Sequence, residues 1–89
     1  MAAILVCDDD KEIVEAISIY LEQEGHQLLK AYDGQQALSV LEKEKVDLLI
    51  IDVMMPRLDG IRATLKIREE HALPIIILSA KSEDADKIL

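Results

Sequence analysis

Four short apolar runs, separated by segments with helical periodicity, constrain the fold of this chain more than any other feature. The runs are "ILVC" at 4–7, "QLLKA" at 27–31, "VDLLII" at 46–51 and "IIIL" at 75–78. The third run is apolar on both faces except at Asp47, and such strands lie in parallel sheets that helices cover on both sides. A chain of 89 residues has room for one small domain. We therefore predict a single three-layer α/β domain over residues 1–89.

The segments between these runs carry the period of amphipathic helices. We predict helices over 11–24, 35–44 and 60–70, and the start of a fourth helix with Ser82 as its N-cap. Gly25 ends the first helix, as a glycine past a helix end often does. The stripe of this helix predicts that Ile13, Val14, Ile17, Tyr20 and Leu21 are buried and that Glu15, Ser18 and Glu22 face solvent.

The composition limits where such a domain acts and what it binds. The net charge of −8 argues against direct contact with nucleic acid or an anionic membrane. No apolar run approaches the roughly 18 to 20 residues of a membrane span, and no signal peptide opens the chain. The single cysteine, Cys7, lies in the first apolar run, where we expect a core residue rather than a reactive thiol. We expect a cytoplasmic protein without an intrachain disulfide.

Acidic and hydroxyl side chains follow three of the predicted strands. Asp8, Asp9 and Asp10 follow the first strand, Asp52 follows the third and Ser79 follows the fourth. Strands 1, 3 and 4 can be neighbours in a doubly wound sheet, whose carboxyl ends form the ligand site. Crowded carboxylates repel unless a cation or hydrogen-bond donors compensate, and oxygen ligands of this kind suit Mg²⁺. We therefore predict a magnesium site.

Each of these residues also has a structural explanation. Asp10 is most simply the N-cap of the following helix, but only one of three consecutive aspartates can take that position. Asp52 and Ser79, taken singly, are ordinary turn residues. The conjunction of all of them at strand ends is what indicates a site.

Three segments in this order resemble the receiver domain of two-component response regulators: "ILVCDDDKEI", "DLLIIDVMMPRLDG" and "LPIIILSAK". "LSAKSEDADKIL" is most similar to receivers of the OmpR/PhoB type. The resemblance implies a flavodoxin-like (CheY-like) fold with strand order 2-1-3-4. It also implies that strand 5, helix 5 and the lysine that ends strand 5 are missing, so we expect a domain incomplete at its C-terminus.

The resemblance further implies a role for each site residue. Asp52 would accept a phosphoryl group, and Ser79 would hydrogen-bond it and act as the switch. Asp9 would bind Mg²⁺ directly and Asp8 through water, while Asp52 and the carbonyl of Met54 would complete the protein's share of the metal ligands. Such a domain is a switch rather than an enzyme that turns over a substrate.

The implied partner is a histidine kinase, and the implied output is transcriptional regulation by a DNA-binding domain outside this chain. Receivers of this type dimerise on phosphorylation. We also expect this segment to self-associate, because the apolar run 75–78 would be an unpaired strand edge.

Two other functions remain open from the residues alone. Asp8, Asp10 and the hydroxyl of Ser79 are similar to motifs of haloacid-dehalogenase-type phosphatases, with Asp8 as nucleophile. Glu12 fits that family poorly, and Asp52 would have no role in it. A receiver fold that serves as a non-phosphorylated interaction module is the other alternative.

Overall fold

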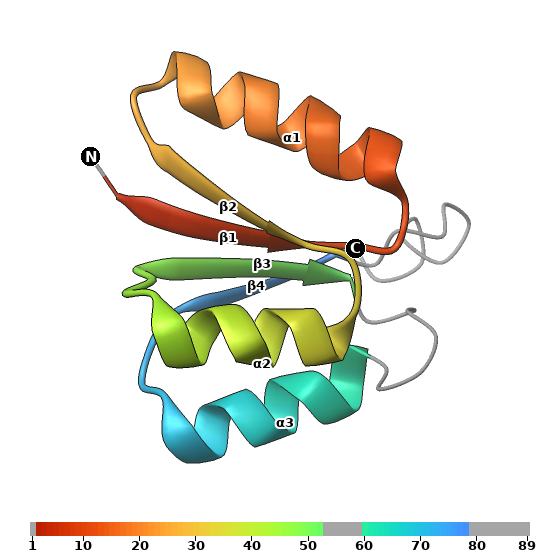
Figure 1. Ribbon diagram of the computed structural model, residues 1–89, viewed down its shortest axis with the longest axis vertical. Helices are drawn as coiled ribbons and strands as arrows, with labels where there is room; N and C mark the ends of the chain where they lie inside the picture. Colours follow the sequence, from red (N-terminus) through yellow and green to blue (C-terminus); the bar gives the residue numbers. More distant parts are fainter. Residues whose placement is uncertain (1, 53–59, 79–89) are drawn as a thin grey trace, which may run out of the picture.

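The structure is a computed structural model that describes residues 2–52 and 60–78. Strands and helices alternate along the described chain (Figure 1). The strands are β1 (Ala3–Cys7), β2 (Gln27–Ala31), β3 (Leu48–Asp52) and β4 (Ile75–Leu78). The helices are α1 (Lys11–Gln23), α2 (Gly34–Lys43) and α3 (Gly60–Glu70).

The four strands form one parallel sheet in the order β2-β1-β3-β4. Leu5 of β1 pairs with Leu29 of β2 on one side and with Leu49 of β3 on the other. Leu49 in turn pairs with Ile75 of β4. This arrangement confirms the predicted α/β class and the order 2-1-3-4.

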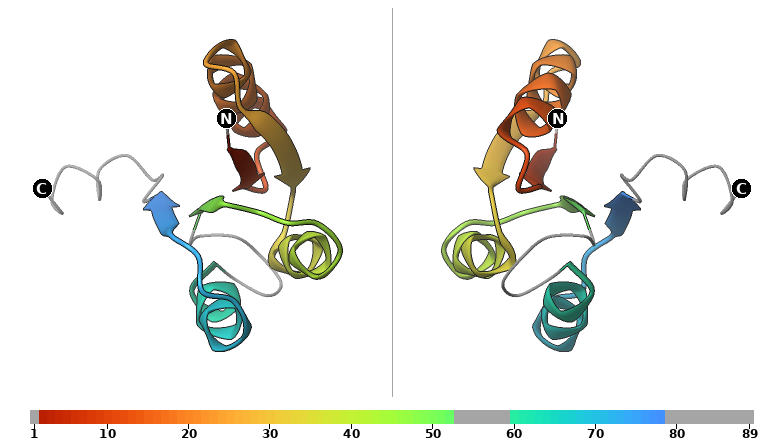
Figure 2. Two further views of the ribbon diagram at one scale, coloured as in Figure 1. Left: turned by 90° about the vertical axis from the view of Figure 1, so that its left-hand side faces the viewer. Right: turned by 90° about the vertical axis from the view of Figure 1, so that its right-hand side faces the viewer.

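Helices cover both faces of the sheet, as predicted. Figures 1 and 2 show α1 on one face and α2 with α3 on the other. Beneath α2 and α3, the core joins odd-numbered strand residues such as Leu5, Leu49 and Ile51 to Ala37 and Ile67. Beneath α1, a smaller core contains Ile4, Val6, Ile50 and Val14. Because side chains alternate along a strand, the two cores share the same strands.

Side-chain caps fix where α1 and α2 begin. Asp10 caps α1 by accepting hydrogen bonds from the N–H groups of Glu12 and Ile13. Asp33 caps α2 by accepting from the N–H of Gln36 at 2.8 Å. Each cap satisfies donors that the first turn of a helix leaves without a partner. After α1, Gly25 has φ of 91°, a backbone conformation that glycine adopts without strain.

Element boundaries agree closely with the sequence-based prediction. β2, α3 and β4 have the predicted bounds. The predicted strand 46–51 is wrong at both ends, because it begins two residues before β3 and stops one residue short of its end. Asp47 lies before β3 and accepts a hydrogen bond from the N–H of Ala3 in β1. Asp52 still belongs to β3. The predicted fourth helix and its Ser82 cap lie outside the described residues.

The predicted buried face of α1 is wrong at two positions. Tyr20 is 64% exposed, whereas Ser18, predicted to face solvent, is 1% exposed. Ser18 follows the buried Val14 by four residues and therefore lies on the same face one turn later. Tyr20 is six residues from Val14, which is roughly 120° around the helix axis.

The two edges of the sheet differ in polarity. On β2, Lys30 pairs with Glu15 of α1 at 3.0 Å. On β4, Ile76 is 49% and Ile77 is 50% exposed, as expected from the apolar run. A charged edge discourages pairing with another chain, and an apolar edge favours it. No helix in the described ranges is long and apolar enough to span a membrane.

Candidate functional site

Two carboxylates lie next to each other at the carboxyl end of the central strands. The register that pairs Cys7 of β1 with Ile51 of β3 brings the following residues, Asp8 and Asp52, side by side. The N–H of Asp8 donates to the carbonyl of Ala31 at 3.2 Å, which holds Asp8 in line with β1. Both aspartates are completely buried.

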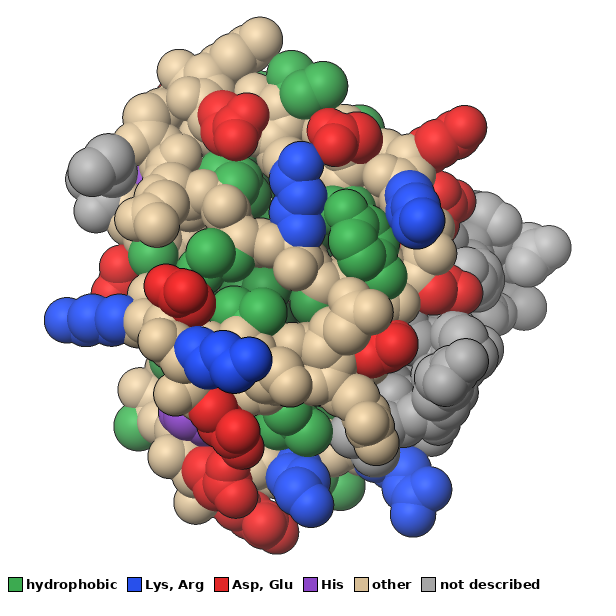
Figure 3. All heavy atoms as spheres, in the orientation of Figure 1, with side chains coloured by type: hydrophobic (Ala, Val, Ile, Leu, Met, Phe, Trp, Pro, Cys, Tyr) green, Lys and Arg blue, Asp and Glu red, His purple; other side chains and the backbone are tan. Residues whose placement is uncertain are grey.

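Asp9 completes a cluster of three carboxylates. One ligand oxygen from each of Asp8, Asp9 and Asp52 lies within 4.8 Å of the other two. Asp9 is exposed, so the cluster is open to solvent on one side. Figure 3 shows acidic side chains over α1 and also over the lower part of the molecule, with basic side chains among them. The arrangement is that of a site for a hard cation.

The three consecutive aspartates have three different environments. Asp8 points inward, and its Oδ1 accepts from the N–H of Asp10 at 2.9 Å. Asp9 faces solvent. Asp10 caps α1, as its structural explanation predicted. Of the three, Asp8 and Asp9 therefore remain available for a cation.

The electrostatics of Asp8 fit a bound cation. Burial raises the pKa of its carboxyl to about 6, while the hydrogen bond from Asp10 works in the opposite direction and the charges of Asp52 and Asp9 raise the pKa further. Its Oδ2 is buried and has no hydrogen-bond partner among the described residues. A divalent cation, or a water bound to it, would supply that partner and would favour the ionised carboxylate. The residues present therefore fit Mg²⁺.

Two neighbouring features were not predicted from the sequence. The Nζ of Lys11 lies 5.6 Å from the centre of the Tyr32 ring, a cation–π contact beside the β1–α1 connection. The Tyr32 N–H donates to Oε1 of Gln36 at 2.9 Å. The aspartate at 33 with a glutamine three residues later is the signal of a helix start that could have located this corner.

The predicted core position of Cys7 agrees with its surroundings. The thiol is completely buried and donates to the carbonyl of Asp33 at 3.3 Å. Burial, together with the nearby carboxylates, raises its pKa to about 12. Because the thiolate is the reactive form, this thiol is inert at neutral pH.

The remaining predicted site residues are not part of the described cluster. Met54 and Ser79 lie outside the described residues. Neither histidine belongs to the cluster of Asp8, Asp9 and Asp52. Nδ1 of His26 accepts from the N–H of Ala2 at 3.2 Å, and His71 directly follows α3.

Comparison with known families separates a receiver domain from the phosphatase alternative. Residues 4–89 match the family described as the response regulator receiver domain. The chain belongs to this family. The receiver domain of a two-component response regulator was the function predicted from the resemblance, and the haloacid-dehalogenase alternative, with Asp8 as nucleophile, is not supported.

Curated relatives place this receiver domain among longer regulators. It is 49% identical over 86 residues to the response regulator GtcR of Aneurinibacillus migulanus, covering 97% of this chain and 36% of that protein. It is 44% identical over 87 residues to the alkaline phosphatase synthesis transcriptional regulatory protein PhoP of Bacillus subtilis, with 97% and 36% covered. The chain thus spans about a third of the length of the relatives it matches.

Solved receiver structures share the fold. The receiver domain of the Francisella response regulator 1452 has a TM-score of 0.85 and 38% identity, covering 99% of this chain and 74% of that one. The response regulator TrrA of Thermotoga maritima, solved in complex with Mg²⁺ and BeF, has a TM-score of 0.78 and 25% identity, with 99% and 96% covered.

Proposed function

We propose that Asp52 accepts a phosphoryl group from a histidine kinase and that the acidic cluster holds Mg²⁺ for this transfer. The observation that carries the proposal is the cluster itself, in which the buried carboxylate of Asp52 lies within 4.8 Å of Asp8 and Asp9 ligand oxygens. The orphaned buried Oδ2 of Asp8 supports the metal. So does the complex of TrrA with Mg²⁺ and BeF.

Each aspartate has a distinct share in metal binding under this proposal. Asp9 binds Mg²⁺ directly, because its exposed carboxylate is free of the helix cap. Asp8 contributes mainly through water, and Asp52 and the backbone carbonyl of Met54 complete the protein ligands. The bound metal neutralises negative charge on the transferring group and on the carboxylates.

The chain's own contribution to the transfer is a positioned nucleophile. A carboxylate oxygen of Asp52 forms a bond to phosphorus while the bond from phosphorus to the kinase histidine nitrogen breaks, which leaves an acyl phosphate on this chain. The hydroxyl of Ser79 donates a hydrogen bond to a phosphoryl oxygen. The added charge of roughly −2 then biases the conformation of the domain, which makes it a switch rather than a turnover enzyme.

We further infer the location, output and partners from what is typical of the family. Residues 1–89 serve as one receiver domain, in the cytoplasm, that controls a DNA-binding output and dimerises on phosphorylation. The segment itself self-associates through the apolar edge of β4, where Ile76 and Ile77 are half exposed. A concentration-independent monomer in light scattering would rule out this self-association.

Intact mass spectrometry after incubation with Mg²⁺ and acetyl phosphate tests the proposal. We expect the mass of one phosphoryl group to be added to the native chain. Asp52→Asn should remove the adduct, because an amide is a poor nucleophile. Glu42→Gln, which makes the same change of charge at an exposed position of α2, should keep it.

The outcomes separate the proposed role from its alternatives. An adduct that survives in Asp52→Asn would place the phosphoryl group elsewhere and overturn the proposal. Absence of any adduct together with absence of Mg²⁺ binding would favour a non-phosphorylated interaction module. Binding of Mg²⁺ that is lost in Asp9→Ala would argue against that alternative.

A further inference from the structure

The residue that follows β2 lies beside the buried carboxylates. The register that places Asp8 next to Asp52 also places Tyr32 on the other side of Asp8, because β1 is the middle strand of the three. Cys7 of β1 pairs with Ala31, the residue before Tyr32. The N–H of Asp8 donates to the carbonyl of Ala31 at 3.2 Å and extends this alignment past the last strand pair. The end of the sheet therefore carries one aromatic ring in line with two carboxylates.

The Tyr32 ring is held in place from two directions. It is partly buried and packs against the small core beneath α1 that contains Val6 and Val14. Its N–H donates to Oε1 of Gln36 at 2.9 Å, and the next residue, Asp33, caps α2. Contact with the core on one side and hydrogen bonding to the start of α2 on the other fix the position of the ring.

A lysine ammonium lies against this ring. Lys11 is the first residue of α1 and follows Asp9 by two positions. Its Nζ lies 5.6 Å from the centre of the Tyr32 ring, within the roughly 6 Å over which a ring face attracts a cation. Within the described ranges, Lys11 forms no ion pair with a carboxylate. The start of a helix carries partial positive charge, so α1 itself does not stabilise the ammonium.

The exposed carboxylate of Asp9 is the competing partner for this ammonium. Asp9 belongs to the acidic cluster and is close to Lys11 along the chain, and the four-carbon stem of a lysine is flexible. An ion pair between them would occupy a ligand oxygen and add a positive charge where a divalent cation binds. The neutral ring of Tyr32 attracts the ammonium without using a carboxylate.

We propose that Tyr32 is a positioning residue for the cation site, whose ring holds the Lys11 ammonium away from Asp9 and so keeps that carboxylate open to Mg²⁺. This inference rests on the proposed function, because it concerns the same site. Tyr32 touches neither the metal nor the phosphoryl group and acts through Lys11. The role requires the face of the ring and not its hydroxyl.

Isothermal titration calorimetry with Mg²⁺ at neutral pH tests the proposal. Tyr32→Leu should weaken Mg²⁺ binding by about two- to fivefold, the factor that a cation–π contact at an exposed site represents. Tyr32→Phe keeps the ring and should bind Mg²⁺ as the native chain does. Tyr20→Leu makes the same change at a 64% exposed position of α1 and should also leave the affinity unchanged.

A second substitution separates the effect of Lys11 from damage to the end of the sheet. In a Lys11→Met background no ammonium remains to occupy Asp9, so adding Tyr32→Leu should leave the affinity for Mg²⁺ unchanged. Equal weakening in the two backgrounds would show that Tyr32 acts through the structure of the sheet end, and would overturn the proposal. Unchanged binding in Tyr32→Leu alone would also overturn it.

NMR spectra of the metal-free chain test the contact itself. The ε-methylene protons of Lys11 should show an upfield ring-current shift that Tyr32→Phe keeps and Tyr32→Leu loses. A Lys11 signal without this shift in the native chain would overturn the proposal whether or not Mg²⁺ binds. A native chain that shows the shift but binds no Mg²⁺ would overturn the proposed function at its metal, and the role of Tyr32 with it.

Discussion

The two faces of the sheet use the same strands for different purposes. Beneath α2 and α3, the alternating residues Leu5 and Cys7 of β1 and Leu49 and Ile51 of β3 are all completely buried. Beneath α1, the intervening residues begin as apolar side chains and end in carboxylates. They run from Ile4 and Val6 to Asp8 on β1, and from Ile50 to Asp52 on β3.

This difference shows how a small domain combines stability with a charged site. Burial disfavours the ionised form of a carboxylate, so we expect the face that carries the buried Asp8 and Asp52 to be the less stable of the two. The face beneath two helices compensates with apolar packing. Four predictions test this division, from the largest expected effect to the smallest.

The largest effect should come from shortening an isoleucine on the well-packed face. Ile51→Ala should lower the free energy of unfolding by about 2 to 5 kcal/mol, because it leaves a cavity in a closed core. Ile50→Ala makes the same chemical change on the α1 face of the same strand, where the side chain belongs to the smaller core, and should have a smaller effect. Urea unfolding followed by circular dichroism measures both.

If Ile51→Ala does not fold, Ile51→Val and Ile50→Val provide the same comparison with a smaller cavity. Equal losses at the two positions would show that the faces do not differ in packing.

The second effect is a gain of stability at neutral pH when the buried charge is removed. The folded-state pKa of Asp8 is about 6, above the ordinary value of 3.8, so the folded chain binds its proton more tightly than the unfolded chain. Stability should therefore fall as pH rises from about 4 to about 6. At pH 7, Asp8→Asn should be more stable than the native chain by up to about 3 kcal/mol, the upper bound that about 1.4 kcal/mol per pKa unit sets.

Unfolding measured across this pH range checks the sign as well as the size. Below pH 4 the native chain and Asp8→Asn should converge. A native chain that gains stability between pH 4 and pH 6 relative to this variant would contradict the raised pKa.

The third effect is stabilisation by Mg²⁺ through the same weak face. At a hundredfold excess over its dissociation constant, a ligand that binds only the folded state stabilises it by about 2.7 kcal/mol. The native chain at pH 7 should show this increase in thermal unfolding experiments, and Asp9→Ala should lose most of it. Glu42→Gln serves as the control for a general effect of charge, and an equal loss there would argue against a specific site.

The smallest effect concerns the buried hydroxyl of Ser18, a residue of α1. Ser18 is 1% exposed, and its Oγ has no hydrogen-bond partner among the described residues. Ser18→Ala should therefore stabilise the fold by about 1 kcal/mol, since an unsatisfied buried polar group is unfavourable. Ser39→Ala, at an exposed position of α2, gives the change due to helix propensity alone. A gain at Ser18 no larger than at Ser39 would show that the hydroxyl is satisfied.

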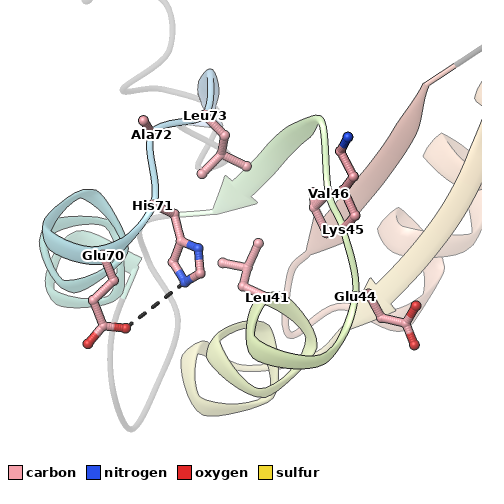
Figure 4. A pocket seen from close by; sticks show the side chains of 8 residues that line it. All are labelled: Leu41, Glu44, Lys45, Val46, Glu70, His71, Ala72 and Leu73. Carbon is pink, nitrogen blue, oxygen red and sulfur yellow. Dashed lines mark ion pairs between the residues drawn. The ribbon is translucent and has the colours of Figure 1, made fainter.

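The sequence predicted the fold more completely than the details of the site. Doubly apolar strands allow few arrangements, so the parallel sheet and the convergence of Asp8 and Asp52 could be predicted. The helix stripe alone could not locate Ser18, because the centre of a buried face depends on how the helix packs. Among the three consecutive aspartates the sequence predicted the helix cap, Asp10, but it gave no signal that Asp8 is buried and Asp9 exposed. The pocket lined by Leu41, Val46 and Leu73 (Figure 4) was not predictable either, since the connections from α2 to β3 and from α3 to β4 that form it are far apart in the sequence.

Cys7 can report how often the fold opens around β1. It is the only cysteine of the chain, it lies in β1 directly before Asp8, and its thiol has a pKa of about 12. A thiol reagent therefore modifies it only in molecules in which β1 has separated from its neighbours. The rate at which the reagent labels Cys7 therefore measures how often β1 opens, and no additional cysteine has to be introduced. Any ligand that holds the carboxylates beside it should lengthen the time before the label attaches.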